Sequence, residues 1–240
     1  MKTGLLVIAT GENYRRYAKN LIESATKFFP PHDVILFTDN ILDEFTQDFC
    51  ANNRVRIIAH RHLGFPLATL MRYHTFMASA TILAEYEYLF YCDADMLFVA
   101  TITEDEILSD GITATLHPGY LNLPGTPERN ENSAAYCPKV EKYYAGGFNG
   151  GKTDAFLRMA EWIIEGVNKD QDKNVKAVWN DESFLNRYLN ENPPSKVLSP
   201  EFCYPENAVT TGYYKTIWTN AGYPDGFVPK LMALEKPKSV

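Results

Sequence analysis

The amino-terminal part of the chain alternates between short apolar runs and stretches with helical periodicity. Apolar runs within Met1–Thr10, Val34–Thr38 and Val55–Ala59 predict buried strands of a parallel sheet, because both faces of such strands are covered. Between the first two runs, apolar residues recur at helical spacing and stop at Pro30-Pro31. A strand, a helix and a strand in this order predict a βαβ unit, in which ligands gather at the carboxyl ends of the strands.

The run from Tyr88 to Ala100 is an apolar strand interrupted by one polar triplet, Asp93-Ala94-Asp95. Two carboxylates cost several kcal/mol to bury unless cations or hydrogen bonds compensate them, so we expect the triplet where the strand ends and a crevice opens. Asp-x-Asp there presents the hard oxygen ligands that Mg²⁺ or Mn²⁺ carrying a diphosphate requires. The alternative is a surface turn with two solvated aspartates.

Two further side chains are candidates for the same crevice. Tyr14 follows the first strand, but its periodicity is equally compatible with packing in the core. A helix predicted from about Leu67 to Glu85 leads into the central strand, and Arg72 lies off its apolar stripe. A solvated surface position is the default for such an arginine, although its helix ends beside the aspartates.

The second half begins with a strand at Thr113–Leu116 and a turn at His117, which is either a structural or a site histidine. Residues 121–135 form a long polar loop, which indicates a binding role or mobility. The glycine-rich stretch that follows, residues 143–151, permits close approach of the backbone to a ligand or forms a structural bulge. It lacks the Lys-Ser/Thr that closes a Walker loop.

Helical periodicity returns at Thr153–Val167 and, after a polar loop at Asn168–Asn174, beyond residue 180. Asn180 is a suitable residue to cap that second helix. Asp181 and Glu182 fall in its first turn, where acidic residues commonly complement the helix dipole and stay ionised. From Glu201 onward the pattern weakens and predicts irregular structure.

Composition narrows the class of protein. The 240 residues suit one large α/β domain or two closely packed halves. A net charge of −7 argues against nucleic acid and anionic membranes as partners. The four cysteines include no CxxC pair, which makes zinc binding and a disulfide framework unlikely to be the basis of the fold. Without an 18-residue apolar run or a signal peptide, we expect a cytoplasmic protein with no membrane span.

Taken together, these motifs resemble glycosyltransferase family 6, which contains the histo-blood-group A/B transferases and α-1,3-galactosyltransferases, and especially its short bacterial and phage-type members. The resemblance covers roughly residues 4–205 and rests on these pieces: Tyr88-Leu89, Asp93-Ala94-Asp95-Met96, Phe98, His117-Pro118-Gly119-Tyr120, Tyr143-Tyr144-Ala145-Gly146-Gly147-Phe148, Gly150-Gly151, Ala177-Val178-Trp179, Asp181-Glu182-Ser183 and Val197-Leu198-Ser199-Pro200-Glu201.

The resemblance implies an α/β fold of the GT-A type, with a Rossmann-like, mostly parallel central sheet flanked by helices. It implies one catalytic domain, 1–240, with a nucleotide-binding half at 1–100, a donor-sugar and acceptor half at 101–205 and an irregular tail at 206–240. It also implies a retaining transfer of galactose or N-acetylgalactosamine from a UDP-sugar to a carbohydrate acceptor, forming an α-linkage, α-1,3 by analogy. The rival hypotheses are a UDP-sugar hydrolase and a non-catalytic sugar- or nucleotide-binding module.

Site residues follow from the matching positions. Asp93 and Asp95 correspond to the family's metal–diphosphate motif, with Mn²⁺, or Mg²⁺, as cofactor. The positions implied to bind the donor are Ile8, Ala9, Tyr14, Arg72, Asp93, Ala94, Asp95, Ala145, Gly146, Gly147 and Asp181. Those implied to bind the acceptor are His117, Thr126, Trp179 and Glu182. Glu182 is also the candidate nucleophile.

This chain departs from the family pattern in several places. Asn180 stands where a histidine is usual, and the loop before Thr126 is shorter than in relatives. Glu206 is the possible substitute for an acidic residue expected near Tyr204. The basic tail, with Lys236 and Lys238, is divergent.

Overall fold

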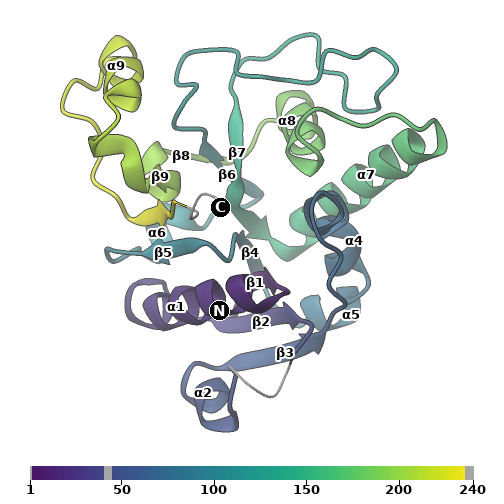
Figure 1. Cartoon of the computed structure of the whole chain (residues 1–240), viewed down its shortest axis with the longest axis vertical. Helices are drawn as coiled ribbons and strands as arrows, with labels where there is room; N and C mark the ends of the chain where they lie inside the picture. Colours follow the sequence, from purple (N-terminus) through teal and green to yellow (C-terminus); the bar gives the residue numbers. More distant parts are fainter. Residues whose placement is uncertain (1, 41–44, 236–240) are drawn as a thin grey trace.

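The computed structural model describes residues 2–40 and 45–235, and a seven-stranded sheet runs through their centre (Figure 1). Its strand order is β3-β2-β1-β4-β7-β6-β8. The strands are β1 (Thr3–Ala9), β2 (Asp33–Thr38), β3 (Val55–Ala59), β4 (Tyr88–Cys92), β6 (Ile112–Leu116), β7 (Tyr144–Lys152) and β8 (Lys196–Leu198). All neighbouring pairs are parallel except those that β7 makes with β4 and β6. The predicted α/β fold with a mostly parallel sheet is therefore confirmed.

Helices cover both faces of this sheet. The helices are α1 (Glu12–Phe28), α2 (Gln47–Asn52), α3 (Leu67–Leu70), α4 (Arg72–Met77), α5 (Ala80–Leu83), α6 (Glu104–Ile107), α7 (Thr153–Asp172), α8 (Asp181–Glu191) and α9 (Tyr213–Asn220). Leu5 and Val7 of β1 pack in one core with α1, whereas Leu6 packs in a second core with α4, α5, α7 and α8. Successive side chains of a strand point to opposite faces, so two covered faces explain the continuous apolar runs.

A second, three-stranded sheet has the order β5-β10-β9. It consists of β5 (Met96–Phe98), β9 (Tyr204–Pro205) and β10 (Leu231–Ala233), with 3₁₀ turns η1 (Pro200–Cys203) and η2 (Glu206–Val209) beside it. The segment after residue 206, for which the sequence predicts irregular structure, thus contains α9 and β10. Lys236 and Lys238 lie outside the described residues.

Two helix predictions differ from the structure. The helix predicted from Leu67 to Glu85 is three short helices, because Met71 and Ser79 take backbone angles outside the α-helical region. The helix predicted to end at Val167 continues to Asp172, so Asn168–Asn174 is not simply a loop. Its extra turn carries Asp170, whose carboxylate accepts hydrogen bonds from the Ser133 hydroxyl and the Ala134 N–H.

The glycine-rich stretch forms most of β7, and its pairing with β6 shifts register between Asn149 and Tyr144, as the predicted bulge would require. A Cβ atom on Gly150 would lie 2.3 Å from the Leu89 carbonyl oxygen, and one on Gly151 would lie 2.0 Å from that of Gly111. These two glycines are required by packing between strands rather than by a ligand.

The polar loop at 121–135 is held against the fold. Besides the contacts of Asp170, the buried Glu128 carboxylate accepts hydrogen bonds from the Asn130 N–H at 2.8 Å and the Val178 N–H at 2.6 Å. This second contact ties the loop to the segment that precedes α8. Across the described ranges, no helix combines the length and apolar character needed to cross a bilayer.

Candidate active site

The candidate active site lies where β1 and β4 end and β7 begins. Parallel strands place their carboxyl ends at one edge of a sheet, and the antiparallel β7 starts at that same edge. Cys92 pairs with Phe148, and the Asp93 N–H donates a hydrogen bond to the Gly147 carbonyl at 2.8 Å. The aspartate triplet therefore follows the buried strand β4, as its sequence predicts, and lies beside the glycines of β7.

A first cavity, of about 150 Å³, opens at this edge of the sheet. Ile8, Tyr14 and the Asp93-Ala94-Asp95 triplet line it together with Arg72. Tyr14 is 40% exposed, which excludes the core-packing alternative. The Ala9 side chain is fully buried in the core with α1 and is not part of the lining, because it points to the opposite face from Ile8.

Several residues that line this cavity were not predicted as site residues, among them His62 and Phe65. The His62 ring nitrogen Nδ1 lies 2.9 Å from the Thr10 hydroxyl, and both residues line the cavity. Phe65, which is 81% exposed, lines it as well. The sequence places Phe65 in the loop before Arg72, but the exposure of its side chain, which indicates a binding role, is seen only in the structure.

A second cavity, of about 190 Å³, is lined by Gly146, Gly147, Trp179, Asn180, Asp181 and Glu182. Thr69, Arg72 and Asp93 line both cavities. The two spaces therefore lie on either side of these three residues, and most of the predicted donor positions converge on them.

Arg72 is buried at the junction, contrary to the surface position expected from its place on the helix. Its Nη2 atom lies 3.3 Å from Asp93 Oδ1, and its Nε atom lies 3.2 Å from Asp181 Oδ2. Its Nη1 atom donates a hydrogen bond of 3.0 Å to the Gly146 carbonyl, and the guanidinium lies 4.2 Å from the centre of the Tyr91 ring. Two carboxylates and a carbonyl thus compensate the burial of the cation.

The two carboxylates next to Arg72 have different surroundings. Asp93 also accepts a hydrogen bond from the Tyr91 hydroxyl. Asp181 is buried, and desolvation raises its pKa to about 6 even though the positive charge of Arg72 acts in the opposite direction. Asp181 is therefore no exposed complement to a helix dipole but part of a buried charge network.

Glu182 is held by two hydrogen bonds. Its Oε1 accepts from the Tyr143 hydroxyl at 2.9 Å, and its Oε2 accepts from the Gly146 N–H at 2.9 Å. Desolvation nevertheless raises its pKa to about 7, while these two hydrogen bonds lower it. The sequence predicts an ionised Glu182 at neutral pH, but loss of solvent outweighs the helix dipole and leaves this carboxyl near the midpoint of its ionisation there.

Two of the positions predicted to bind the acceptor, His117 and Thr126, lie against Tyr143. The Thr126 hydroxyl lies 3.5 Å from the Tyr143 hydroxyl, which in turn donates to Glu182. The ring of His117 packs against Tyr143 with centroids 5.7 Å apart, and burial lowers the pKa of His117 to about 4. Trp179 is 49% exposed beside the cavity. Tyr143, which belongs to one of the family motifs but was not predicted as a site residue, therefore links Thr126 to Glu182.

The glycines of β7 are fitted closely against the site carboxylates. A Cβ atom on Gly146 would lie 3.2 Å from Glu182 Oε2. One on Gly147 would lie 3.2 Å from Asp93 Oδ2 and from Met96 Sδ. Ala145 is buried and, unlike the two glycines, lines neither cavity. Glu206 also lies outside both linings, and its Oε2 accepts a hydrogen bond from the Glu235 N–H.

Asp93 and Asp95 line the same cavity, but no group of three or more His, Cys, Asp or Glu residues surrounds a common point in the part of the chain that the structure describes. Mg²⁺ and Mn²⁺ in nucleotide enzymes are commonly held by one or two carboxylates, with phosphate oxygens and water completing the coordination. The two aspartates therefore fit an ion that binds together with a diphosphate.

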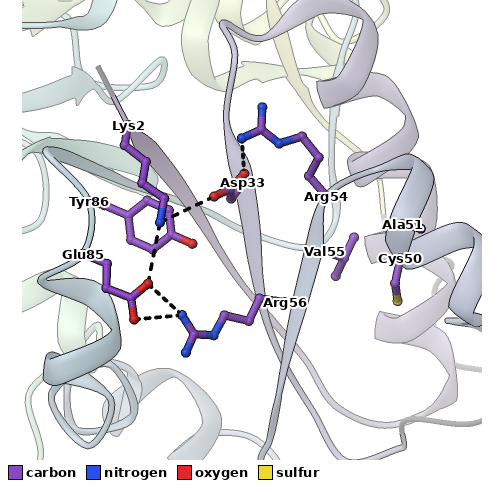
Figure 2. A pocket seen from close by; sticks show the side chains of 9 residues that line it. All are labelled: Lys2, Asp33, Cys50, Ala51, Arg54, Val55, Arg56, Glu85 and Tyr86. Atoms are coloured by element: carbon purple, nitrogen blue, oxygen red, sulfur yellow. Dashed lines mark hydrogen bonds and ion pairs between the residues drawn. The ribbon is translucent and has the colours of Figure 1, made fainter.

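Another cavity, of about 370 Å³, lies at the amino ends of β1, β2 and β3 (Figure 2). Its charged side chains pair with one another: Lys2 lies 3.6 Å from Glu85, Arg54 lies 2.5 Å from Asp33, and Arg56 lies 3.1 Å from Glu85. Because these charges are mutually compensated and exposed, the cavity does not compete with the strand-end site as the candidate active site.

The fold and the site together define the class of GT-A glycosyltransferases: a mostly parallel sheet flanked by helices, with Asp-x-Asp at the end of a central strand. Within this class the chain belongs to glycosyltransferase family 6, whose sequence model matches residues 1–221.

Among its relatives is the O-antigen biosynthesis glycosyltransferase WbnI of Escherichia coli, 30% identical over 213 residues, which are 86% of this chain and 89% of that protein. The histo-blood group ABO system transferase 2 of Rattus norvegicus is 32% identical over 212 residues, 84% of this chain and 63% of that protein. The human globoside alpha-1,3-N-acetylgalactosaminyltransferase 1 is 30% identical over 220 residues, 84% of this chain and 60% of that protein. The matched region thus spans less than two thirds of these two mammalian proteins.

Proposed function

We propose that this protein is a metal-dependent, retaining hexosyltransferase that moves galactose or N-acetylgalactosamine from UDP to a hydroxyl group of an acceptor sugar, forming an α-linkage, α-1,3 by analogy. The observation that carries the proposal is the position of Arg72. It joins Asp93, which lines the first cavity, to Asp181, which lies beside Glu182 in the second cavity. A cation at this junction lies between the places proposed for the diphosphate and the sugar.

The first cavity is the proposed site of UDP. Ile8 and Tyr14 are proposed to contact the uridine, and Asp93 and Asp95 are proposed to hold Mn²⁺ or Mg²⁺ together with the diphosphate. Such an ion, when bound, stabilises negative charge on the departing UDP. Arg72 adds a fixed positive charge in a site with little solvent, where electrostatic stabilisation of developing charge is strongest.

Glu182 is the proposed catalytic residue. Retention requires either a carboxylate on the face of the sugar opposite UDP or a same-face route assisted by the leaving phosphate. In the first route, the ionised Glu182 bonds to the anomeric carbon as UDP leaves with the bonding electrons. The acceptor oxygen then displaces the Glu182 carboxylate, and its proton passes to a phosphate oxygen of UDP. In the second, Glu182 stabilises positive charge on the sugar or holds the acceptor hydroxyl. Its hydrogen bonds from Tyr143 and Gly146 support either role, because they fix the carboxylate in place.

The acceptor is proposed to bind on the side of Trp179, where an exposed indole can pack against a sugar ring. His117 is neutral at pH 7 because burial lowers its pKa to about 4, so one ring nitrogen accepts and the other donates. Its Nδ1 already accepts from the Gly119 N–H at 3.1 Å, which leaves Nε2–H as the donor for an acceptor oxygen.

The deciding experiment incubates the protein and Mn²⁺ with UDP-galactose or UDP-N-acetylgalactosamine, with and without a panel of galactoside acceptors. Release of UDP that depends on an acceptor, with an α-anomeric product by NMR, is the expected result. Equal release of UDP without any acceptor would instead identify a UDP-sugar hydrolase. Binding of UDP-sugars without turnover in any condition would identify a non-catalytic module.

A further inference from the structure

Asn180 carries a buried polar atom without a partner. The residue is 8% exposed, and its Oδ1 makes no hydrogen bond with any described residue. Three other described side chains carry such an atom, namely His32, His74 and Asn149, but Asn180 is the one among them that lines a cavity of the candidate active site. A buried acceptor left without a donor costs stability, so a ligand that donates a hydrogen bond to it would be favoured. Oδ1 is covered by protein atoms in this structure, and it reaches a ligand in the cavity when the side chain turns toward that space.

The backbone of Asn180 is unusual as well. Its φ of 50° and ψ of −126° lie in a region that non-glycine residues rarely adopt. The sequence predicts a helix cap at this residue, and Asn180 does occupy the N-cap position of α8, but its side chain makes no capping hydrogen bond. The carboxamide therefore does not cap α8, although the local sequence predicts that it does.

The surroundings of Asn180 indicate which chemical group of a ligand would suit this cavity. The cavity that it lines also exposes Arg72, Asp93, Asp181 and Glu182, so one cation and three carboxylates already occupy its wall. A neutral carbonyl oxygen among these groups accepts a hydrogen bond from a hydroxyl group without adding charge. Hydroxyl groups are the donors that a hexose supplies in number.

We propose that Asn180 Oδ1 accepts a hydrogen bond from a hydroxyl group of the transferred sugar, which makes Asn180 a specificity residue for the donor. The inference rests on the proposed function, since it places the donor sugar in the cavity that Arg72 and Asp93 share with the nucleotide side. It concerns a position at which this chain departs from the histidine that is usual in the family.

Asn180→Gly is the variant of choice, because glycine adopts positive φ readily and the substitution removes the carboxamide together with its one methylene group. Asn174→Gly is the matched control: Asn174 has φ 53°, is exposed after α7 and lines neither cavity. Comparing the two separates loss of the carboxamide from a change in backbone strain. Thermal unfolding of both variants verifies that each is folded.

Calorimetry with Mn²⁺ then measures the affinity of each protein for UDP, UDP-galactose and the 2-, 3-, 4- and 6-deoxy analogues of UDP-galactose. We expect Asn180→Gly to weaken binding of UDP-galactose about tenfold, to leave UDP unchanged, and to abolish discrimination against one deoxy analogue that the parent binds about tenfold less well. Asn174→Gly should match the parent throughout.

Equal losses for every donor, or none, would overturn the assignment of Asn180, and the orphan oxygen would then be satisfied by water. A parent protein that binds no UDP-sugar more tightly than UDP would overturn it too. Transfer is measured separately: UDP-sugar binding without transfer refutes the proposed reaction, while the binding comparison still decides the role of Asn180.

Discussion

Arg72 and Asp181 form an ion pair in the interior of the protein, with 3.2 Å between Arg72 Nε and Asp181 Oδ2 and both side chains almost entirely buried. Arg72 begins α4 and Asp181 begins α8, so the pair joins two helices from different halves of the chain. Removing one member of a buried ion pair leaves the other charge without compensation, which costs far more than the pair contributes. The site and the stability of the fold therefore depend on the same contact.

Arg72→Ala should destabilise the protein by about 3–5 kcal/mol, because Asp181 and Asp93 would lose their common cation. Arg72→Lys keeps the charge but not the forked geometry, and should lower turnover about 10²-fold with a smaller loss of stability. Urea unfolding and transfer rates measure the two effects. The control is Arg158→Ala, which removes an exposed i,i+4 pair with Asp154 and should change stability by less than about 0.5 kcal/mol. Similar effects at both arginines would contradict the interpretation.

Glu182→Gln should lower turnover about 10²-fold or more while UDP still binds, because a neutral amide can neither attack the anomeric carbon nor stabilise positive charge. If Glu182 only complemented the dipole of α8, the substitution would cost at most about 1 kcal/mol of stability and no activity. Calorimetry of UDP binding beside the transfer rate separates these cases. A Gln variant with turnover near that of the parent would remove Glu182 from the mechanism.

Activity should rise with pH through about 7, because the pKa of Glu182 is raised to about 7 and the proposed chemistry needs its ionised form. Tyr143→Phe should move this midpoint upward, since the Tyr143 hydroxyl donates a hydrogen bond that lowers the pKa of Glu182. The pH profiles of the two proteins under saturating donor provide the measurement. An unchanged midpoint in the Phe variant would separate Tyr143 from the ionisation of Glu182.

The same pKa has an opposite consequence for stability. A carboxyl group whose folded pKa is raised binds protons more strongly when folded, so its contribution is present at low pH and is lost as pH rises through about 7. Glu182→Gln should therefore gain stability relative to the parent between pH 4.5 and 7, on the order of 3 kcal/mol. Urea unfolding of both proteins across this range tests the sign, and a constant difference would refute it.

Metal binding should depend on the aspartate pair. Asp95→Asn is the cleaner test, because Asp93 is also paired with Arg72 and bonded to Tyr91. We expect Asp95→Asn, alone or with Asp93→Asn, to abolish stimulation of transfer by Mn²⁺ and to weaken Mn²⁺ binding measured by electron paramagnetic resonance in the presence of UDP. Unchanged activity of the parent in EDTA would exclude a required ion.

UDP-N-acetylgalactosamine should be used at least as well as UDP-galactose, because Gly146 and Gly147 line the second cavity and have no side chain that would narrow it. Gly147→Ala should then penalise N-acetylgalactosamine more than galactose. The added methyl group would also press on Asp93 and Met96, each 3.2 Å away, so both donors should lose some activity. The ratio of the two kcat/KM values is the measurement, and equal losses would refute a role in donor choice.

The local sequence pattern determined the strands of the central sheet and the position of the aspartate triplet. Continuous apolar runs located β1, β2, β3 and β4, because a strand covered on both faces has no polar positions. The cost of burying carboxylates placed Asp93-Ala94-Asp95 at the end of β4, where the structure has it. Helix lengths were predicted less well, since single residues such as Met71 and the tertiary contacts of Asp170 decide where a helix ends.

The tertiary structure alone decided the electrostatics of the site. The burial of Arg72, the raised pKa of Glu182 and the orphan oxygen of Asn180 each depend on groups from segments distant in sequence. Periodicity reports which face of a helix is apolar, but it does not report which carboxylate or amide meets that helix across a fold. Desolvation and charge pairing depend on these tertiary contacts. Because of them, Arg72, Glu182 and Asn180, for which the sequence predicts ordinary surface or capping roles, lie at the centre of the candidate active site.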